Sequence, residues 1–327
     1  MPAVQLNRQR YAARLNAFKA ALPPDRHDVP HLIELVARVG KLDAADLNFP
    51  EHVSAANEAA VRTALEANGM FLNGLAMRYY GEPDFAMGAF TNPDPAARRK
   101  AIDQTREAID ACARLGARQL TLWMGQDGFD YAFQMDYARA WDDTISAMAE
   151  VADHNREIDV AFEYKPNDPR AHSLMPDIGT TLLATRELDR PNVGVTLDFA
   201  HVLYADEMPA YAASLVARHS RLLGVHLNDG YGKRDDGLMV GTVHPVATVE
   251  LFVELDRIGY DGVIYFDTFP DLSGLDPVEE VRTNVHMAER LAIVADKLRT
   301  SRDLAAAIAR QDATLSQRIV ARALYGE

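Results

Sequence analysis

The chain has 327 residues, 48% hydrophobic and 25% charged, and its 48 Asp and Glu against 34 Lys and Arg give a net charge of −14. This composition is typical of a folded globular protein and argues against a disordered or fibrous one. The acidic balance, with no basic run, argues against nucleic acid as a partner, because such binding depends on cations that contact phosphates.

Helical and strand patterns alternate along the chain. In order, we expect a helix near 32–36, a strand at 42–49, helix 55–68, strand 70–76, helix 95–115, strand 119–123, helix 133–154, strand 158–164, helix 177–189, strand 193–197, helix 207–219, strand 222–227, helix 246–258, strand 263–266, and helical stretches at 276–298 and 301–324. This alternation predicts right-handed crossovers and a parallel sheet.

These patterns give seven clear strands, and the first strand of an eightfold barrel is expected near the N-terminus. No glycine-rich phosphate-binding motif follows a strand, which argues against a nucleotide-binding fold. No linker divides the chain. We therefore predict a (β/α)8 TIM barrel with additional N- and C-terminal helices, in which residues 1–300 form a single catalytic domain and 301–327 a C-terminal helical extension.

The cysteine content and the hydropathy bear on location. Cys112 is the only cysteine, so an internal disulfide and a Cys-based zinc site are both excluded. No apolar run approaches the roughly 18 to 20 residues that cross a bilayer, and the N-terminus lacks the apolar core of a signal peptide. We expect a cytoplasmic protein with no membrane partner, and Cys112 in the core.

Metal-binding residue types follow four successive strands. Because the active sites of such barrels lie at the carboxyl ends of the strands, these side chains are expected to meet at one point. Carboxylate oxygens and imidazole nitrogens bind divalent ions, and a buried group of acids needs a cation. We predict one ion, with Mn²⁺ favoured and Mg²⁺ or Co²⁺ as alternatives, held by Glu163, Asp198, His226 and Asp267.

A second group of metal-binding residues lies on the loop side of these strands. His201 is three residues beyond Asp198, and Asp235 and Asp236 are adjacent in the loop after His226. Together His201, Asp235 and Asp236 are candidates for a second ion a few ångströms away, as in two-metal sites that polarise two substrate oxygens.

Each of these residues alone has an ordinary structural interpretation. Asp198 is a typical helix N-cap, His226 a typical hydrogen-bonded core histidine, and Asp235 with Asp236 a solvated turn. His244, in GTVHP, is expected to precede a helix and not to bind metal. Four potential ligands at four consecutive strand ends favour the metal interpretation.

Trp123 ends a strand at the same rim of the predicted barrel. Packing of the barrel explains it most simply, whereas an apolar wall against a sugar ring is the functional alternative. It is our candidate for a substrate contact.

The segments FEYKP, LDFAH and GVHLNDGYGKRDDG, in this order, resemble the xylose isomerase-like TIM barrels, most closely the L-rhamnose isomerase branch, over roughly residues 94 to 300. The resemblance implies the two ion sites given above, with Lys165 facing the substrate oxygens. It makes Lys165, His201 and Asp235 the candidate catalytic residues. It further implies interconversion of an unphosphorylated aldose and ketose by a metal-assisted 1,2-hydride shift, in a dimer or tetramer.

Two positions depart from that branch. The branch carries a histidine on an early strand, where the segment AADLNFPEH offers Asn48, a second candidate substrate contact, with His52 displaced. The acidic loop has RDDG in place of alternating aspartates, which affects the second ion.

Other functions stay open on the residues alone. A one-metal epimerase, dehydratase or C-glycoside-cleaving lyase would keep the four ligands of the first ion and abstract a proton next to a carbonyl. An apurinic endonuclease shares the barrel, but the acidic balance and the shortage of strand-end histidines argue against it. A non-catalytic sugar-binding barrel would bind no metal.

Overall fold

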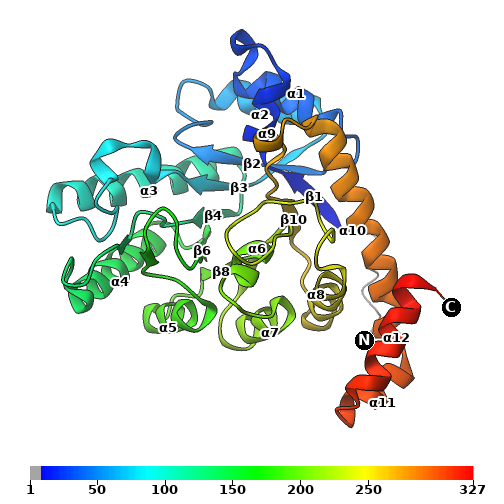
Figure 1. Cartoon of the computed structure of the whole chain (residues 1–327). Coiled ribbons are helices and arrows are strands. Elements are labelled where there is room, and N and C mark those ends of the chain that lie inside the picture. Colours follow the sequence, from blue (N-terminus) through cyan, green and yellow to red (C-terminus); the bar gives the residue numbers. More distant parts are fainter. Residues whose placement is uncertain (1–8, 327) are drawn as a thin grey trace.

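The computed structural model of the protein describes residues 9–326. Within this range eight parallel strands form one sheet in the order β1-β10-β9-β8-β6-β4-β3-β2. Their bounds are β1 Arg10–Ala13, β2 Ala44–Phe49, β3 Phe71–Met77, β4 Gln119–Leu122, β6 Asp159–Glu163, β8 Val193–Asp198, β9 Leu222–Leu227 and β10 Val263–Phe266. The seven expected strands and the eighth near the N-terminus are present, and the predicted TIM barrel with extra helices is confirmed (Figure 1).

Contacts between β1 and β2 close the sheet into a barrel. Arg14 and Asp46 form a parallel bridge, and the backbone N–H of Asp43 donates to the carbonyl of Tyr11 at 2.9 Å. Strand β1 has only four residues, RYAA, so it lacks the apolar run that made the other strands recognisable.

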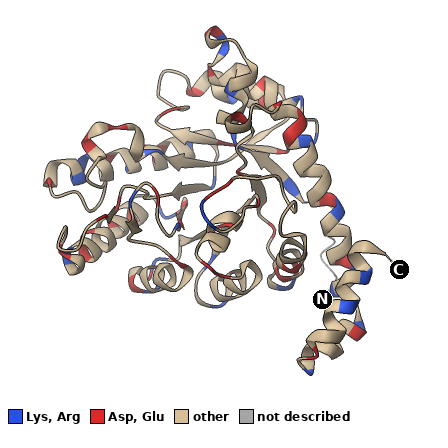
Figure 2. Ribbon diagram, in the orientation of Figure 1, with Lys and Arg blue, Asp and Glu red and all other residues tan. Residues whose placement is uncertain are grey.

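Helices follow the strands and cover the outside of the barrel (Figure 1). They are α1 Val29–Ala37, α2 Glu58–Ala67, α3 Pro95–Leu115, α4 Tyr137–His154, α5 Ile178–Leu188, α6 Phe199–Tyr204, α7 Pro209–His219, α8 Pro245–Ile258, α9 Pro270–Ser273, α10 Pro277–Arg299, α11 Arg302–Ala309 and α12 Ala313–Tyr325, with short 3-10 helices at Leu15–Ala21, Pro24–Arg26, Tyr79–Gly81 and Pro83–Phe85. Lys and Arg are interspersed with Asp and Glu along these helices (Figure 2), as on an ordinary solvated surface.

The C-terminal helical stretch expected at 301–324 is two helices. Helix α11 ends before Gln311, whose φ of 54° is left-handed, and Asp312 caps α12 by accepting from the backbone N–H of Leu315. Both helices lie beside the end of α10, on the outer side of the molecule (Figure 1). A functional boundary at residue 300 stays a prediction.

A small second sheet joins two loops at the carboxyl ends of the strands. Strands β5 (Gly128–Phe129) and β7 (His172–Ser173) pair antiparallel. They connect the loop after β4 to the loop after β6, which carries Lys165. The backbone N–H of Lys165 donates to the carbonyl of Met175 at 3.2 Å, so this loop pairing fixes the backbone at Lys165.

No helix in the described part of the chain combines the length and the apolar character that crossing a membrane requires. Cys112 is buried in α3, as expected, and its thiol donates to the carbonyl of Gln119 at 3.4 Å.

Candidate metal centre

Four metal-binding side chains converge at the carboxyl ends of neighbouring strands. Glu163 ends β6, Asp198 ends β8, His226 lies on β9 and Asp267 directly follows β10. One ligand atom from each lies within 4.8 Å of the others. The structure therefore brings together the four residues that sequence reasoning assigned to the first ion.

The electrostatics of this group fit a cation. Burial tends to raise the pKa of Glu163, but the charge and hydrogen bond of His226 outweigh burial and bring the pKa to about 2. Burial tends to lower the pKa of His226, but Glu163, at 3.2 Å from its Nδ1, raises it to about 10. Burial and then nearby acids raise the pKa of Asp198 to about 7. Without a metal, the protonated ring of His226 therefore balances part of the negative charge of the three carboxylates. A divalent cation would supply this positive charge instead, and its binding would release the proton.

Asp198 has a structural role beside its candidate role as a ligand. Its Oδ1 accepts from the backbone N–H of His201 at 3.0 Å and so caps α6. Asn228 holds the same carboxylate, because its Nδ2 donates to Oδ1 and Oδ2 at 3.3 and 3.2 Å. The helix cap and the convergence with the other donors are therefore compatible.

Asn228 is a functional candidate that sequence reasoning missed. It is fully buried, its Nδ2 also donates to the carbonyl of Asp267 at 3.0 Å, and its Oδ1 accepts from the backbone N–H of Ala200 at 2.8 Å. Its place between His226 and Asp229 in the HLND segment was the available signal. Outer partners of this kind orient metal ligands.

The three candidate catalytic residues also meet. The ammonium of Lys165 and the Nε2 of His201 each lie 3.2 Å from the same Oδ2 of Asp235. The Nδ1 of His201 donates to the carbonyl of Tyr164 at 3.0 Å, which fixes the ring. The other carboxylate oxygen of Asp235 is buried with no hydrogen-bond partner.

The ligand set expected for a second ion is divided. Asp236 does not join His201 and Asp235. Its carboxylate accepts from the backbone N–H of Tyr231 and the Nε of Arg234, both at 2.8 Å. Among the described residues, the grouping that satisfies metal-ligand spacing is the first set of four. A second ion stays a prediction.

Asp229 and His244 support the backbone near the site. Asp229 is fully buried and accepts from the backbone N–H groups of Val243 and His244 and from the ring of His244, all at 2.8 Å. His244 directly precedes α8, as expected.

Asn48 and His52 lie together after β2. The ring Nδ1 of His52 accepts from the backbone N–H of Asn48 at 3.0 Å, and the Asn48 side chain donates to Glu51 at 3.1 Å. Asn48 lines the cavity at the metal centre, whereas His52 is not among the lining residues.

A cavity of about 350 Å³ opens onto three of the four donors, Glu163, His226 and Asp267, whereas Asp198 lies behind its lining. Its lining includes the candidates Lys165, His201, Asp235, Trp123 and Asn48. The ring of Trp123 packs against Tyr80 at 5.5 Å between centroids, and the ammonium of Lys165 lies 5.1 Å from its centroid. Trp123 therefore packs and also faces the cavity. The volume is within the range of small-molecule sites.

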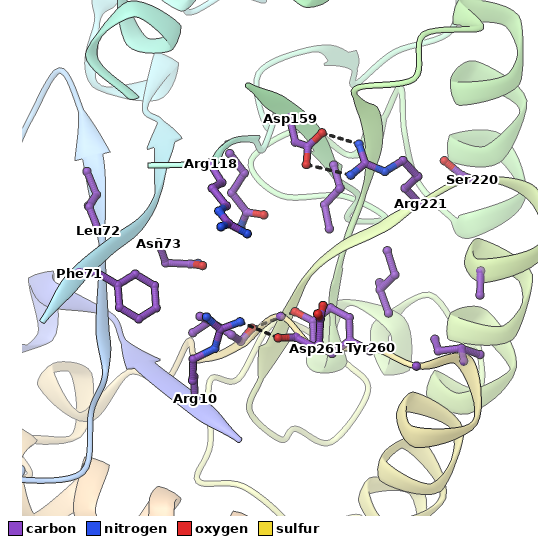
Figure 3. Close-up of a pocket in the computed structure, with 18 of the residues that line it drawn as sticks. Arg10, Phe71, Leu72, Asn73, Arg118, Asp159, Ser220, Arg221, Tyr260 and Asp261 are labelled. Carbon is purple, nitrogen blue, oxygen red and sulfur yellow. Dashed lines mark hydrogen bonds and ion pairs between the residues drawn. The ribbon is translucent and has the colours of Figure 1, made fainter. Parts of the chain in front are cut away.

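A larger cavity of about 680 Å³ lies at the opposite end of the barrel (Figure 3). The amino ends of the strands line it, with Arg10, Arg118 and the ion pair of Arg221 with Asp159. None of the candidate site residues belongs to it, so size alone does not mark the functional end of this barrel.

Residues 33–291 match the family model described as xylose isomerase-like TIM barrel. The chain belongs to this family. It is 30% identical over 212 residues to the xylose isomerase of Thermus thermophilus, a match that covers 63% of this chain and 55% of that protein. The chain thus spans about half the length of the curated relatives it matches.

Solved structures resemble the whole barrel. An L-ribulose 3-epimerase has a TM-score of 0.71 at 16% identity, covering 90% of this chain and 99% of that one. A D-allulose 3-epimerase from Methylomonas sp., in complex with D-allulose, has a TM-score of 0.65 at 17% identity, covering 86% and 97%. At these identities the likeness concerns the fold. Membership of the L-rhamnose isomerase branch stays a prediction.

Proposed function

We propose that this chain is a metal-dependent isomerase of unphosphorylated sugars, with one divalent cation held by Glu163, Asp198, His226 and Asp267. The convergence of these donors within 4.8 Å at the mouth of the barrel carries the proposal. The family, together with relatives that are named as sugar isomerases and epimerases, supports a sugar as the substrate. Mn²⁺ is the favoured ion, because the donors are carboxylates and an imidazole without thiolates.

When bound, the cation polarises the carbonyl and an adjacent hydroxyl of the sugar. Glu163 and Asp267 come from β6 and β10, and β8 and β9 lie between these strands in the sheet. In a proton-transfer route, one of these carboxylates would remove a proton next to the carbonyl and the other would return one. Lys165 adds positive charge beside the reacting oxygens, while Trp123 and Asn48 contact the sugar.

The site supports two chemical routes, proton transfer if it holds one ion and a hydride shift if it holds two. The single assembled donor set supports proton transfer, because Asp236 turns toward its own loop. The hydride shift between C1 and C2 is the second candidate, supported by the relative named as a xylose isomerase and by the position of Lys165 in the cavity.

Turnover in D₂O separates the two routes. The Mn²⁺-loaded protein is incubated with aldoses and ketoses, and NMR follows deuterium at the carbon next to the carbonyl. Proton transfer predicts that solvent deuterium appears there, whereas a hydride shift leaves the substrate hydrogen on the product. A metal-loaded protein that converts none of these sugars contradicts the proposal.

We also propose a cytoplasmic location, which the single reduced Cys112 supports, and a homo-oligomer. The terminal helices α11 and α12 are the candidate contact. Light scattering of the full chain should give a dimer or tetramer, and a monomer would contradict this part of the proposal.

A further inference from the structure

Arg78 differs from the other cationic side chains that line the cavity at the metal centre. Four Lys and Arg residues line this cavity, and three of them have an acidic partner. These pairs are Arg14 with Asp271 at 2.9 Å, Lys165 with Asp235 at 3.2 Å, and Arg234 with Asp236 at 2.8 Å. Within residues 9–326, the guanidinium of Arg78 has neither an ion pair nor a hydrogen bond.

The guanidinium of Arg78 is half-buried and has no acidic partner within ion-pair distance in the described part of the chain. The Nε of Arg78 is buried with no acceptor. Arginine keeps its charge in proteins, and because Arg78 is only half-buried, its terminal N–H groups, unlike Nε, remain accessible. The ring of Tyr80, whose centroid is 5.6 Å from the guanidinium carbon, provides a cation–π contact but no lone pair for the N–H groups. The terminal N–H groups are therefore available to an acceptor that enters the cavity.

The position of Arg78 indicates what that acceptor is. Arg78 directly follows β3, at the same end of the barrel as the four metal donors, and lines the same cavity as Glu163 and Trp123. Tyr80, beside Arg78, packs edge-on against Trp123. The indole N–H of Trp123 is also buried without an acceptor. Arg78 and Trp123 thus lie on the same side of the cavity, joined through Tyr80.

We propose that the substrate of this site is a sugar that carries a carboxylate, and that Arg78 binds this carboxylate. This inference rests on the proposed function, because it places the carbonyl end of the same sugar at the metal donors. The planar N–H groups of a guanidinium match the two oxygens of a carboxylate, whereas a hydroxyl offers one uncharged oxygen. One unpaired arginine balances one negative charge, which favours a carboxylate over a phosphate dianion.

The other cations of the cavity do not serve this role. The ammonium of Lys165 is held between Asp168 and Asp235. Arg14 is held by Asp271 and lies 3.9 Å from Asp267. Binding a carboxylate at either residue breaks an existing ion pair, whereas binding at Arg78 breaks none.

Calorimetry of the Mn²⁺-loaded protein tests the inference. Several hexuronates are compared with the neutral hexoses of the same configuration. One charge-assisted hydrogen-bonded pair predicts that a hexuronate binds roughly 10- to 100-fold more tightly than its neutral counterpart. Arg78→Met should bring the ratio of hexuronate affinity to neutral-hexose affinity close to one. Arg78→Lys, which keeps the charge without the planar fork, should retain part of it.

Arg234→Met is the matched control, because Arg234 lines the same cavity but is paired with Asp236 and exposed. It should keep the full preference. The inference is overturned if no hexuronate outbinds its neutral counterpart, if a hexose 6-phosphate binds more tightly than the hexuronate, or if Arg78→Met weakens both kinds of sugar equally. If the protein retains its metal but converts neutral sugars and no hexuronate, this inference is overturned and the proposed function stands. Loss of the metal overturns the proposed function.

Discussion

At the scale of single residues, Asn228 connects two of the four donor positions. Its amide holds the Asp198 carboxylate and the backbone of Asp267 at the same time. It also ties the start of α6 to β9 through Ala200. Removing this side chain leaves the ligands present but free to rotate, and loss of an outer partner typically weakens metal binding by roughly 10- to 100-fold.

We therefore expect Asn228→Ala to weaken Mn²⁺ binding by about 10- to 100-fold, measured by titration against a competing chelator. Asn192→Ala is the matched control, because Asn192, just before β8, is also buried and its amide also donates two hydrogen bonds, to the carbonyls of Ala152 at 2.9 Å and Ile158 at 3.0 Å. It should lower stability and leave metal affinity near wild type. Equal metal affinities in the two variants would contradict the role given to Asn228.

His52 gives a prediction about acid stability. Burial lowers its pKa from 6.5 to about 4, so the folded chain binds fewer protons there than the unfolded chain. This contribution is fully present above pH 6.5 and is lost as the pH falls toward 4. It amounts to roughly 3 kcal/mol at most, at 1.36 kcal/mol per pKa unit.

Urea unfolding between pH 7 and pH 4.5 measures this contribution. The unfolding free energy of the wild type should fall more steeply with acid than that of His52→Gln, which lacks the titrating ring. Parallel pH profiles would show that His52 carries no such linkage.

Some residues of the site could be predicted from the sequence, and others could not. The four donors were predictable because each lies at or next to the carboxyl end of an apolar strand, and these ends meet in a barrel. Asp235 and Asp236 were not separable, because neighbouring residues in an irregular loop point in different directions. Asn228 and Arg78 depend on which partners surround them in space, and a linear pattern does not contain that information.

At the scale of elements, the pair of β5 and β7 fixes the loop that carries Lys165. A Cβ on Gly128 would lie 2.1 Å from the carbonyl oxygen of His172, a backbone atom. The backbone N–H of Ser173 in turn donates to the carbonyl of Pro166, next to Lys165. Any side chain at position 128 therefore separates the two loops.

Gly128→Ala should lower the free energy of unfolding by about 1–3 kcal/mol, as overpacking typically does, and should reduce turnover because Lys165 is displaced. Gly81→Ala is the control, because a Cβ there meets no atom within 4 Å. Urea unfolding and activity of the metal-loaded proteins check both effects. Wild-type values for Gly128→Ala would contradict the close approach.

Most elements could be predicted from periodicity and apolar runs, and the exceptions have physical reasons. Strand β1 is short, so its pairing with β10 and β2 decides its conformation more than its own sequence does. The break between α11 and α12 falls at Gln311, where the left-handed residue that ends a helix is not the usual glycine. Helix α4 begins later than expected, because Asp136 caps it by accepting from the backbone N–H of Arg139.

At the scale of the whole molecule, closing the barrel creates the site. The donors lie on four different strands, so the unfolded chain does not hold them together, and metal binding favours the folded state. A cation at 100 times its dissociation constant adds about 2.7 kcal/mol to the free energy of unfolding.

Chelator-treated protein should therefore melt several degrees lower than protein with excess Mn²⁺. Asp198→Asn should show no such difference, and a wild-type melting temperature that ignores Mn²⁺ would contradict the site.

Elemental analysis of the purified, Mn²⁺-loaded and dialysed protein tests the central claim most directly. Beside the wild type, Glu163→Gln and Asp198→Asn are measured at the same protein concentration. We expect about one equivalent of metal per wild-type chain, because four donors form one set, and little or none in either variant. A wild type without metal, or variants that retain as much as the wild type, would contradict it.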